Sequence, residues 1–153
     1  MIQRKQSIYL FIAALLNAGV FYFSLYTYHI FTSAATTTGT TNTDTFFEVK
    51  VNDHYPLLLI AVVMTILPLI TIFMFRNRKR QTRLSFVCIL AIASFISMAL
   101  NRVAHLSTLN PPPTHGSYWI GSILPAISFV FIILAILGIS RDEKLVKSVD
   151  RLR

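Results

Sequence analysis

Few residues in this sequence have side chains suited to chemistry, and they are scattered along the chain. The four histidines all lie at or beyond one boundary of the apolar segments: His29, His54, His105 and His115. A shared side suggests a metal site or a pH sensor, but no two stand at ligand spacing and no acidic cluster accompanies them. Cys88 is the single cysteine, so there is no disulfide framework. We therefore expect individual histidines at the membrane interface, with no metal and no cofactor.

The sequence also lacks the motifs that mark an active site. It has no glycine-rich phosphate loop, no nucleophile elbow and no zinc motif. Asp142 and Glu143 are adjacent, but they stand at the start of an expected helical tail, where the helix dipole favours acidic residues. We therefore expect a protein that is not an enzyme. The competing idea, a membrane enzyme acting on lipid or envelope precursors, rests on the histidines alone.

Any function must be positioned by four long runs that contain no Asp, Glu, Lys or Arg. They cover residues 7–31, 57–75, 84–100 and 118–140. At about 1.5 Å per residue they reach about 26 to 37 Å, which matches a hydrocarbon core of roughly 30 Å. The chain of 153 residues is 54% hydrophobic and 13% charged, which excludes a soluble globular enzyme and a disordered chain. We predict an all-α membrane protein, a single bundle of four transmembrane helices.

The basic residues indicate the orientation of this bundle. Of the 14 Lys and Arg residues, all but Lys50 and Arg102 lie before the first run, in the link 76–83, or after the fourth run. The positive-inside rule therefore predicts that both termini are cytoplasmic. The net charge of +8 is then mainly a topology signal, and we expect no nucleic-acid partner.

The cytoplasmic link is the most basic segment. Membrane insertion alone explains this cluster, but such clusters also attract anionic lipid headgroups. The link residues are therefore candidate lipid or partner contacts: Arg76, Arg78, Lys79, Arg80 and Arg83.

The C-terminal tail, residues 141–153, has the pattern of an amphipathic helix. Its apolar stripe includes Leu145, Val149 and Leu152, and basic residues occupy the opposite face. Such a helix either continues the fourth span or lies in the headgroup plane. Its stripe is a candidate contact either for lipid or for a cytoplasmic partner protein.

The two outer loops, 32–56 and 101–117, differ in character. Residues 32–45 are rich in Thr, Ser and Ala and should be flexible. From Phe47 to Val51 apolar and polar residues alternate, which predicts one short strand. Because one strand is not stable alone, it must pair within its own loop, lie on the rim of the bundle or extend the sheet of a partner.

Three positions inside the apolar runs are candidate packing or kink sites. Asn17 is the one polar group that we expect to need a partner across the bundle. Pro68 and Pro125 each lack an amide hydrogen and free the carbonyl four residues earlier, at Met64 and Gly121. Kinked helices also form binding sites in transporters.

The two ends of the chain carry a family resemblance. The opening Met1-Ile2-Gln3-Arg4 and the closing segment 142–153, with the four runs and the basic link, resemble small four-helix inner-membrane proteins of Bacteroidota catalogued as a domain of unknown function. A weaker family feature, Gly and Pro near the start of the fourth run, is matched by Gly121 and Pro125. The resemblance implies a bacterial inner membrane, and it supplies no activity.

The function that we expect combines the missing chemistry with the features present. A defined tail, a strand and helix-packing positions without a reactive constellation favour an accessory or assembly subunit of a larger inner-membrane complex. Its expected partners are membrane lipids and other inner-membrane proteins. The alternative is a small transporter or channel that uses the proline-kinked helices.

Overall fold

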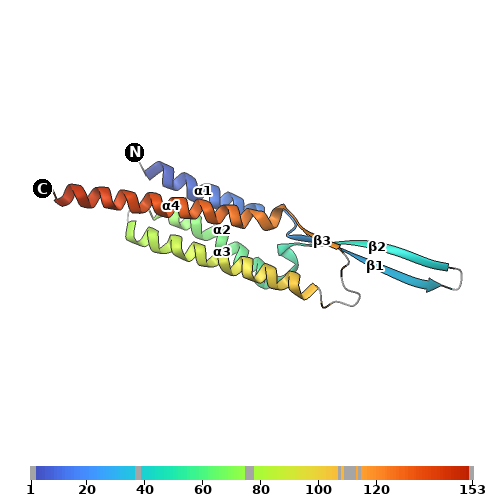
Figure 1. The fold of residues 1–153 in the computed structure, drawn as a ribbon. Helices are drawn as coiled ribbons and strands as arrows, with labels where there is room; N and C mark the ends of the chain where they lie inside the picture. The colour runs from blue at the N-terminus through green and yellow to red at the C-terminus, as the bar shows by residue number, and fades with distance from the viewer. Residues whose placement is uncertain are drawn as a thin grey trace.

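A computed structural model of the chain shows a helical bundle with a sheet at one end (Figure 1). It describes residues 3–36, 39–74, 78–106, 108, 113 and 115–151. The elements are α1 (Gln3–Gly19), β1 (Tyr26–Thr36), β2 (Gly39–Val49), a 3-10 turn η1 (Val51–Asp53), α2 (Tyr55–Phe73), α3 (Arg78–Leu106), β3 (His115–Tyr118) and α4 (Ile120–Arg151). The four helices run side by side. The start of α1 and the end of α4 lie at one end of the bundle, and the strands lie at the other.

Three of the helices are long and apolar enough to cross a membrane. They cover Tyr55–Phe73, Arg80–Leu106 and Ile120–Asp142. The apolar part of α1, Gln6–Gly19, is shorter. At about 1.5 Å per residue it reaches about 21 Å, less than a hydrocarbon core of about 30 Å.

The prediction of one helix over residues 7–31 is wrong in its second half. α1 ends at Gly19, where the amides of Val20 and Tyr22 bond to the carbonyls of Asn17 and Gly19 in a turn. β1 then begins at Tyr26. Aromatic and β-branched residues dominate the start of β1, and they favour a strand. An uninterrupted apolar run does not distinguish helix from buried strand, so this boundary was missed.

The sheet also corrects the all-α prediction and the expectation of a flexible segment at 32–45. Its strand order is β2-β1-β3, with both pairings antiparallel. β1 pairs with β2 from Tyr26↔Val49 to Thr36↔Gly39. The strand expected from Phe47 onward therefore pairs within its own loop and is much longer than predicted. Threonine-rich sequence suits a strand because the β-branched side chain is stiff.

Other helix boundaries also differ from the predicted ones. α3 begins at Arg78, so most of the link predicted at 76–83 is helical, and it continues to Leu106, inside the second predicted outer loop. The fourth run was predicted from Tyr118, but Tyr118 belongs to β3 and α4 begins at Ile120. α4 is continuous to Arg151, so the tail extends the fourth helix.

Apolar side chains of all sizes fill the inside of the bundle, and large apolar side chains also cover its outside. The buried core includes Leu10, Ala13, Leu57, Met64, Phe95 and Ile132. Each helix nevertheless exposes large apolar side chains, among them Ile8, Phe11, Leu15, Leu59, Leu90 and Val130. A soluble bundle would bury such a surface, whereas lipid accommodates it.

Candidate functional site

Asn17 and Pro68, which were chosen separately from the sequence, both affect the hydrogen bonding of one atom, the carbonyl oxygen of Met64. Pro68 lies inside α2 and cannot donate to the carbonyl of Met64. Asn17 Nδ2 of α1 donates to that carbonyl at 2.8 Å. Both Asn17 and Met64 are fully buried. The predicted cross-bundle partner of Asn17 is therefore the carbonyl that the proline frees, and the contact joins α1 to α2.

Further polar contacts join α1 to α4. Ser128 Oγ donates to the carbonyl of Ala13 at 3.3 Å, in a buried position. Nearer the start of α1, Gln6 Nε2 donates to Asp142 Oδ2, and both side chains are buried. The absence of a Cβ at Gly138 leaves room for the Gln6 side chain, since a Cβ there would lie 2.9 Å from Gln6 Cγ. These two contacts join α1 to α4 at separate points along the helices.

The second proline, Pro125, is near the junction between bundle and sheet. It lines an apolar cavity of 210 Å³ together with Phe95 and Tyr118. Gly121, whose carbonyl Pro125 frees, approaches the turn after α1 so closely that a Cβ would lie 2.6 Å from the Ser24 carbonyl oxygen. The Gly121 amide donates to that same oxygen at 3.2 Å.

Backbone hydrogen bonds continue this junction into the sheet. Leu25 donates to the carbonyl of Val49 at 2.9 Å and accepts from the amide of Trp119 at 3.1 Å. Ser24 Oγ donates to Glu48 Oε2 at 2.8 Å. The two residues just before β1 thus connect β2 to the segment that leads from β3 into α4.

Aromatic side chains cross one face of the sheet. Tyr28 stacks on Phe47 with ring centroids 5.4 Å apart, and Tyr26 meets Tyr118 edge-to-face at 5.1 Å. These tyrosines lie in the runs 7–31 and 118–140 that were predicted to be helical, but they form cross-strand pairs. On β2, Phe46 remains 53% exposed.

An ion pair lies at the base of β2. Lys50 Nζ is 2.8 Å from Glu48 Oε2, and Ser24 donates to the same carboxylate. The hydrogen bond from Lys50, followed by the one from Ser24, lowers the pKa of Glu48 below its usual value. The same pair raises the pKa of Lys50. Because both side chains are exposed, this pair contributes little to stability.

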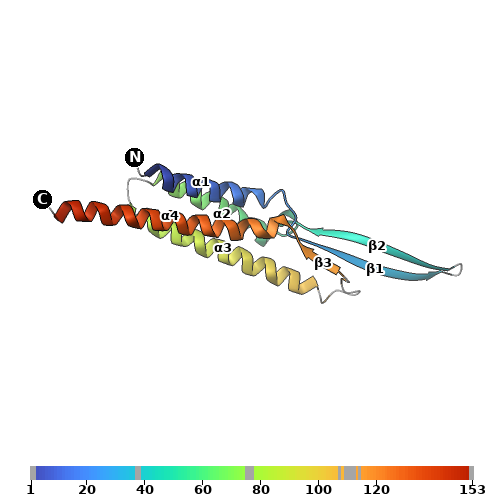
Figure 2. The same cartoon turned by 45° about the horizontal axis from the view of Figure 1, so that its top comes forward.

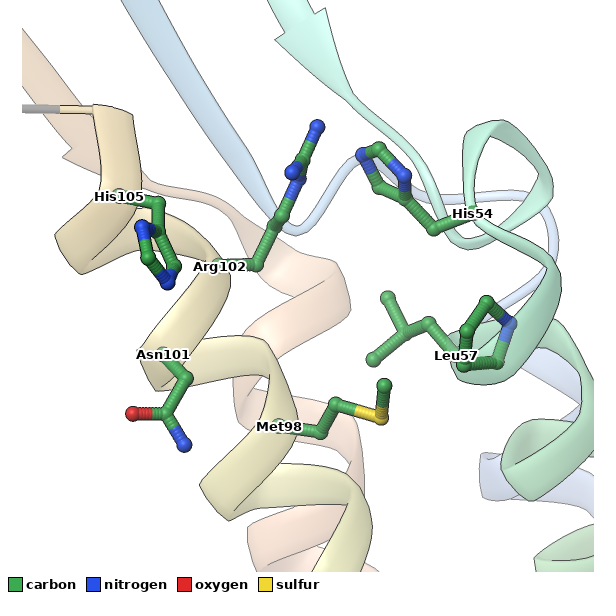
Figure 3. A pocket seen from close by; sticks show the side chains of 7 residues that line it. His54, Leu57, Met98, Asn101, Arg102 and His105 are labelled. Carbon is green, nitrogen blue, oxygen red and sulfur yellow. The ribbon is translucent and has the colours of Figure 1, made fainter. Parts of the chain in front are cut away.

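The candidate site proper is a cavity of 440 Å³ between the start of α2 and the end of α3 (Figure 3). Two helix ends distant in sequence contribute its lining: His54 and Leu57 come from the α2 side, and α3 contributes Met98, Asn101, Arg102 and His105. In Figure 3 the Arg102 and His54 side chains rise together at the mouth, while Leu57 and Met98 face each other below. Its rim is therefore basic and its floor apolar.

The sequence missed this grouping. His54 and His105 had been treated as separate interfacial residues, and Arg102 had been used only in counting charges. Their separation of about fifty residues along the chain conceals that α2 and α3 are antiparallel neighbours. Among the described residues, no group of three His, Cys, Asp or Glu side chains is arranged to hold a metal ion. The one signal in the sequence was that Arg102, like Lys50, is a basic residue outside the predicted cytoplasmic segments.

The structure describes only some of the residues predicted to make cytoplasmic contacts. Arg80 and Arg83 are exposed in the first turns of α3, which also contains Arg78 and Lys79. Leu145 and Val149 lie in the last part of α4. Two predicted contacts, Arg76 and Leu152, lie outside the described residues.

A comparison with known families now bears on the resemblance carried by the chain's ends. The model of a family described as "Domain of unknown function (DUF4293)" matches residues 2–152. The chain belongs to this family. No curated protein and no solved structure matches it. Membership of a family of unknown function, which the resemblance implied, is therefore confirmed. It adds no activity, so function must be argued from the geometry.

Proposed function

We propose that this protein is a non-catalytic integral membrane protein of the bacterial inner membrane, and that it acts as an accessory or assembly subunit of a larger complex. One observation carries the proposal: the β1–β2 hairpin projects beyond the helices in both views (Figures 1 and 2). In the sheet order β2-β1-β3, the outer edge of β2 pairs with no described strand. An exposed strand edge is a ready template for an extended segment of another chain.

The attachment of the hairpin supports a role in presenting this edge. A flexible loop would lose conformational entropy on binding, which weakens association. Here eleven residue pairs connect β1 to β2 in continuous register, and β3 braces the base of β1. The backbone bonds of Leu25 tie the sheet to α4 and to β2. The edge is therefore already ordered before a partner arrives.

We further propose the topology in which this subunit works. All four helices lie in the membrane, with both termini in the cytoplasm and the hairpin outside. The apolar outer surface of the short helix α1 supports its burial in lipid: Ile8, Phe11 and Leu15 are each more than half exposed. The exposed Arg80, Arg83 and Arg141 are at the opposite end from the hairpin, which agrees with the positive-inside rule. There they would also contact anionic lipid.

The transport alternative gains no support from the proline kink. A binding site at a broken helix uses backbone groups that the kink leaves open. The Met64 carbonyl opposite Pro68 instead accepts a hydrogen bond from Asn17, in a fully buried position. This geometry makes the kink a packing contact.

Site-specific photo-crosslinking in intact cells tests the assembly role. A photoreactive residue replaces Phe46 on β2, and a matched control replaces Leu59 on the outer face of α2, where 63% of the side chain is exposed. We expect a discrete protein adduct from position 46 and only lipid adducts from position 59. Absence of any protein adduct at 46, together with a monomer in several mild detergents, would contradict the proposal.

Thiol labelling tests the topology separately. Asn52→Cys should react with an impermeant reagent added outside the inner membrane, whereas Arg83→Cys should react only after the membrane is opened. Both positions are exposed, and the native Cys88 is fully buried and should stay silent. Labelling of position 83 from outside would show the inverted orientation.

A further inference from the structure

We propose that the cavity between α2 and α3 binds the phosphate group of an anionic phospholipid in the outer leaflet. This site is separate from the β2 edge and from the cytoplasmic basic link. The cavity of 440 Å³ opens where two helices long enough to span a membrane begin and end. Phosphate groups of lipids lie at that depth, just outside the hydrocarbon core.

Charge complementarity identifies the headgroup as anionic. Arg102 is exposed at the cavity and makes no ion pair with any described residue. The other basic residue at this end, Lys50, is already paired with Glu48 at 2.8 Å. Asp53, the acidic residue preceding His54, accepts a hydrogen bond from the Lys50 amide. Arg102 therefore remains the cation with unused donors, and guanidinium matches phosphate in geometry.

Further donors surround the same opening. His54, which precedes α2, and His105, which lies on α3, both line it, as does Asn101. No side chain caps the first amides of α2. An anion is favoured at such a helix start by the dipole and by the amides of the first turn, of which Pro56 provides none. The N-terminus alone would be a weak signal, but here it adds to a fixed cation and two imidazoles.

The floor of the cavity indicates that the ligand is an amphiphile and not a free ion. Leu57 and Met98 face each other below the basic rim (Figure 3). Leu57 is only 1% exposed, so these two side chains close the floor with apolar surface. The start of an acyl chain can lie against them while the phosphate stays at the rim.

A competing explanation is purely structural. Arg102 and His105 stand in the last turns of α3, where cations offset the negative end of the helix dipole. That role requires no ligand. The two explanations differ in what a charge-removing substitution does to lipid binding.

Native mass spectrometry of the detergent-solubilised full chain tests the proposal with phosphatidylglycerol as the probe and phosphatidylcholine as the zwitterionic reference. We expect a preference for phosphatidylglycerol and a loss of about tenfold or more in its binding on Arg102→Gln, since hydrogen bonds to charged groups contribute about 1.5–3 kcal/mol. The matched control is Lys50→Gln: Lys50 is a basic residue at the same end of the molecule, but it is paired with Glu48 at 2.8 Å and does not line the cavity, so this variant should bind like the parent.

Two further arms decide the nature of the ligand. Glycerol phosphate, which lacks acyl chains, should compete poorly, and Met98→Trp should weaken phosphatidylglycerol binding by filling the floor. Protection of Cys88 from alkylation verifies that each variant is folded. Equal binding by Arg102→Gln and Lys50→Gln, or no preference over phosphatidylcholine, would overturn the proposal. Effective competition by glycerol phosphate would also overturn it, because the site would then hold a soluble phosphate.

Discussion

Replacing Asn17 by alanine should destabilise the bundle through one carbonyl of α2. The Asn17 amide donates to the Met64 oxygen at 2.8 Å, and Pro68 removes the helical donor that this oxygen would otherwise have. A buried group left without its partner costs about 1–3 kcal/mol. Hydrogen bonds between membrane helices average only about 0.6 kcal/mol and reach about 1.7 kcal/mol, because the separated helices find other partners.

The proline places this contact near the upper end of that range. In a separated α2, the Met64 carbonyl still has no helical donor, since residue 68 carries no amide hydrogen. One effect acts in the opposite direction: Asn17 Oδ1 is buried without a hydrogen-bond partner among the described residues, and alanine removes that cost. We expect a coupling energy of about 1 kcal/mol or slightly more between positions 17 and 68.

A double-mutant cycle isolates this coupling. Pro68→Ala restores an amide that can donate to Met64, so Asn17→Ala should cost about 1 kcal/mol less in that background. The cavity left by the smaller side chain appears in both backgrounds and cancels. Alkylation of Cys88 measures unfolding, because this thiol is single in the chain and fully buried when folded. Equal costs of Asn17→Ala in the two backgrounds would refute the reasoning.

Other perturbations test the junction, the tail and the hairpin base. Gly121→Ala should destabilise the chain by about 1–3 kcal/mol, because its Cβ meets backbone oxygens of the turn at 2.6 and 2.7 Å. Gly19→Ala is the control: its Cβ would meet only the ends of the Leu124 and Phe23 side chains, at 3.0 and 4.0 Å, so it should be near neutral in the same alkylation assay. Because the folded pKa of Glu48 is lowered, its stabilising contacts are present above the usual value of 4.5 and are lost as pH falls below it. The fluorescence of the single tryptophan, Trp119, should therefore change slightly in acid, and Glu48→Gln should remove that change; an unaltered acid transition would contradict this. The tail is tested by serine substitutions in its apolar stripe, at Leu145, Val149 and Leu152. If the tail docks on a partner protein, these substitutions should abolish co-purification of the partner while membrane insertion persists. An intact complex with a tail released from lipid would disprove docking.

The cross-bundle contact was partly predictable, and the basic cavity was not. An asparagine inside an apolar run has hydrogen-bonding groups to satisfy, and a helical proline leaves one carbonyl without its helical donor. The sequence therefore predicts that the asparagine and this carbonyl each need a partner. That they satisfy each other depends on the alignment of α1 beside α2. His54 and Arg102 carry no such local signal, because an exposed histidine or arginine at a helix end is satisfied by water.

Sequence alone determined the presence of long apolar helices, the distribution of positive charge and the family. These properties follow from composition over windows of about twenty residues. The suitability of each window for crossing a membrane depends on its own residues and not on contacts with other segments. Tertiary structure decided where the first run changes from helix to strand at Tyr26, and that Thr-rich sequence forms a hairpin. Strand pairing is non-local: β1 is extended because β2 and β3 supply its hydrogen bonds, and β3 lies about ninety residues away along the chain. No periodicity within residues 7–31 contains that information.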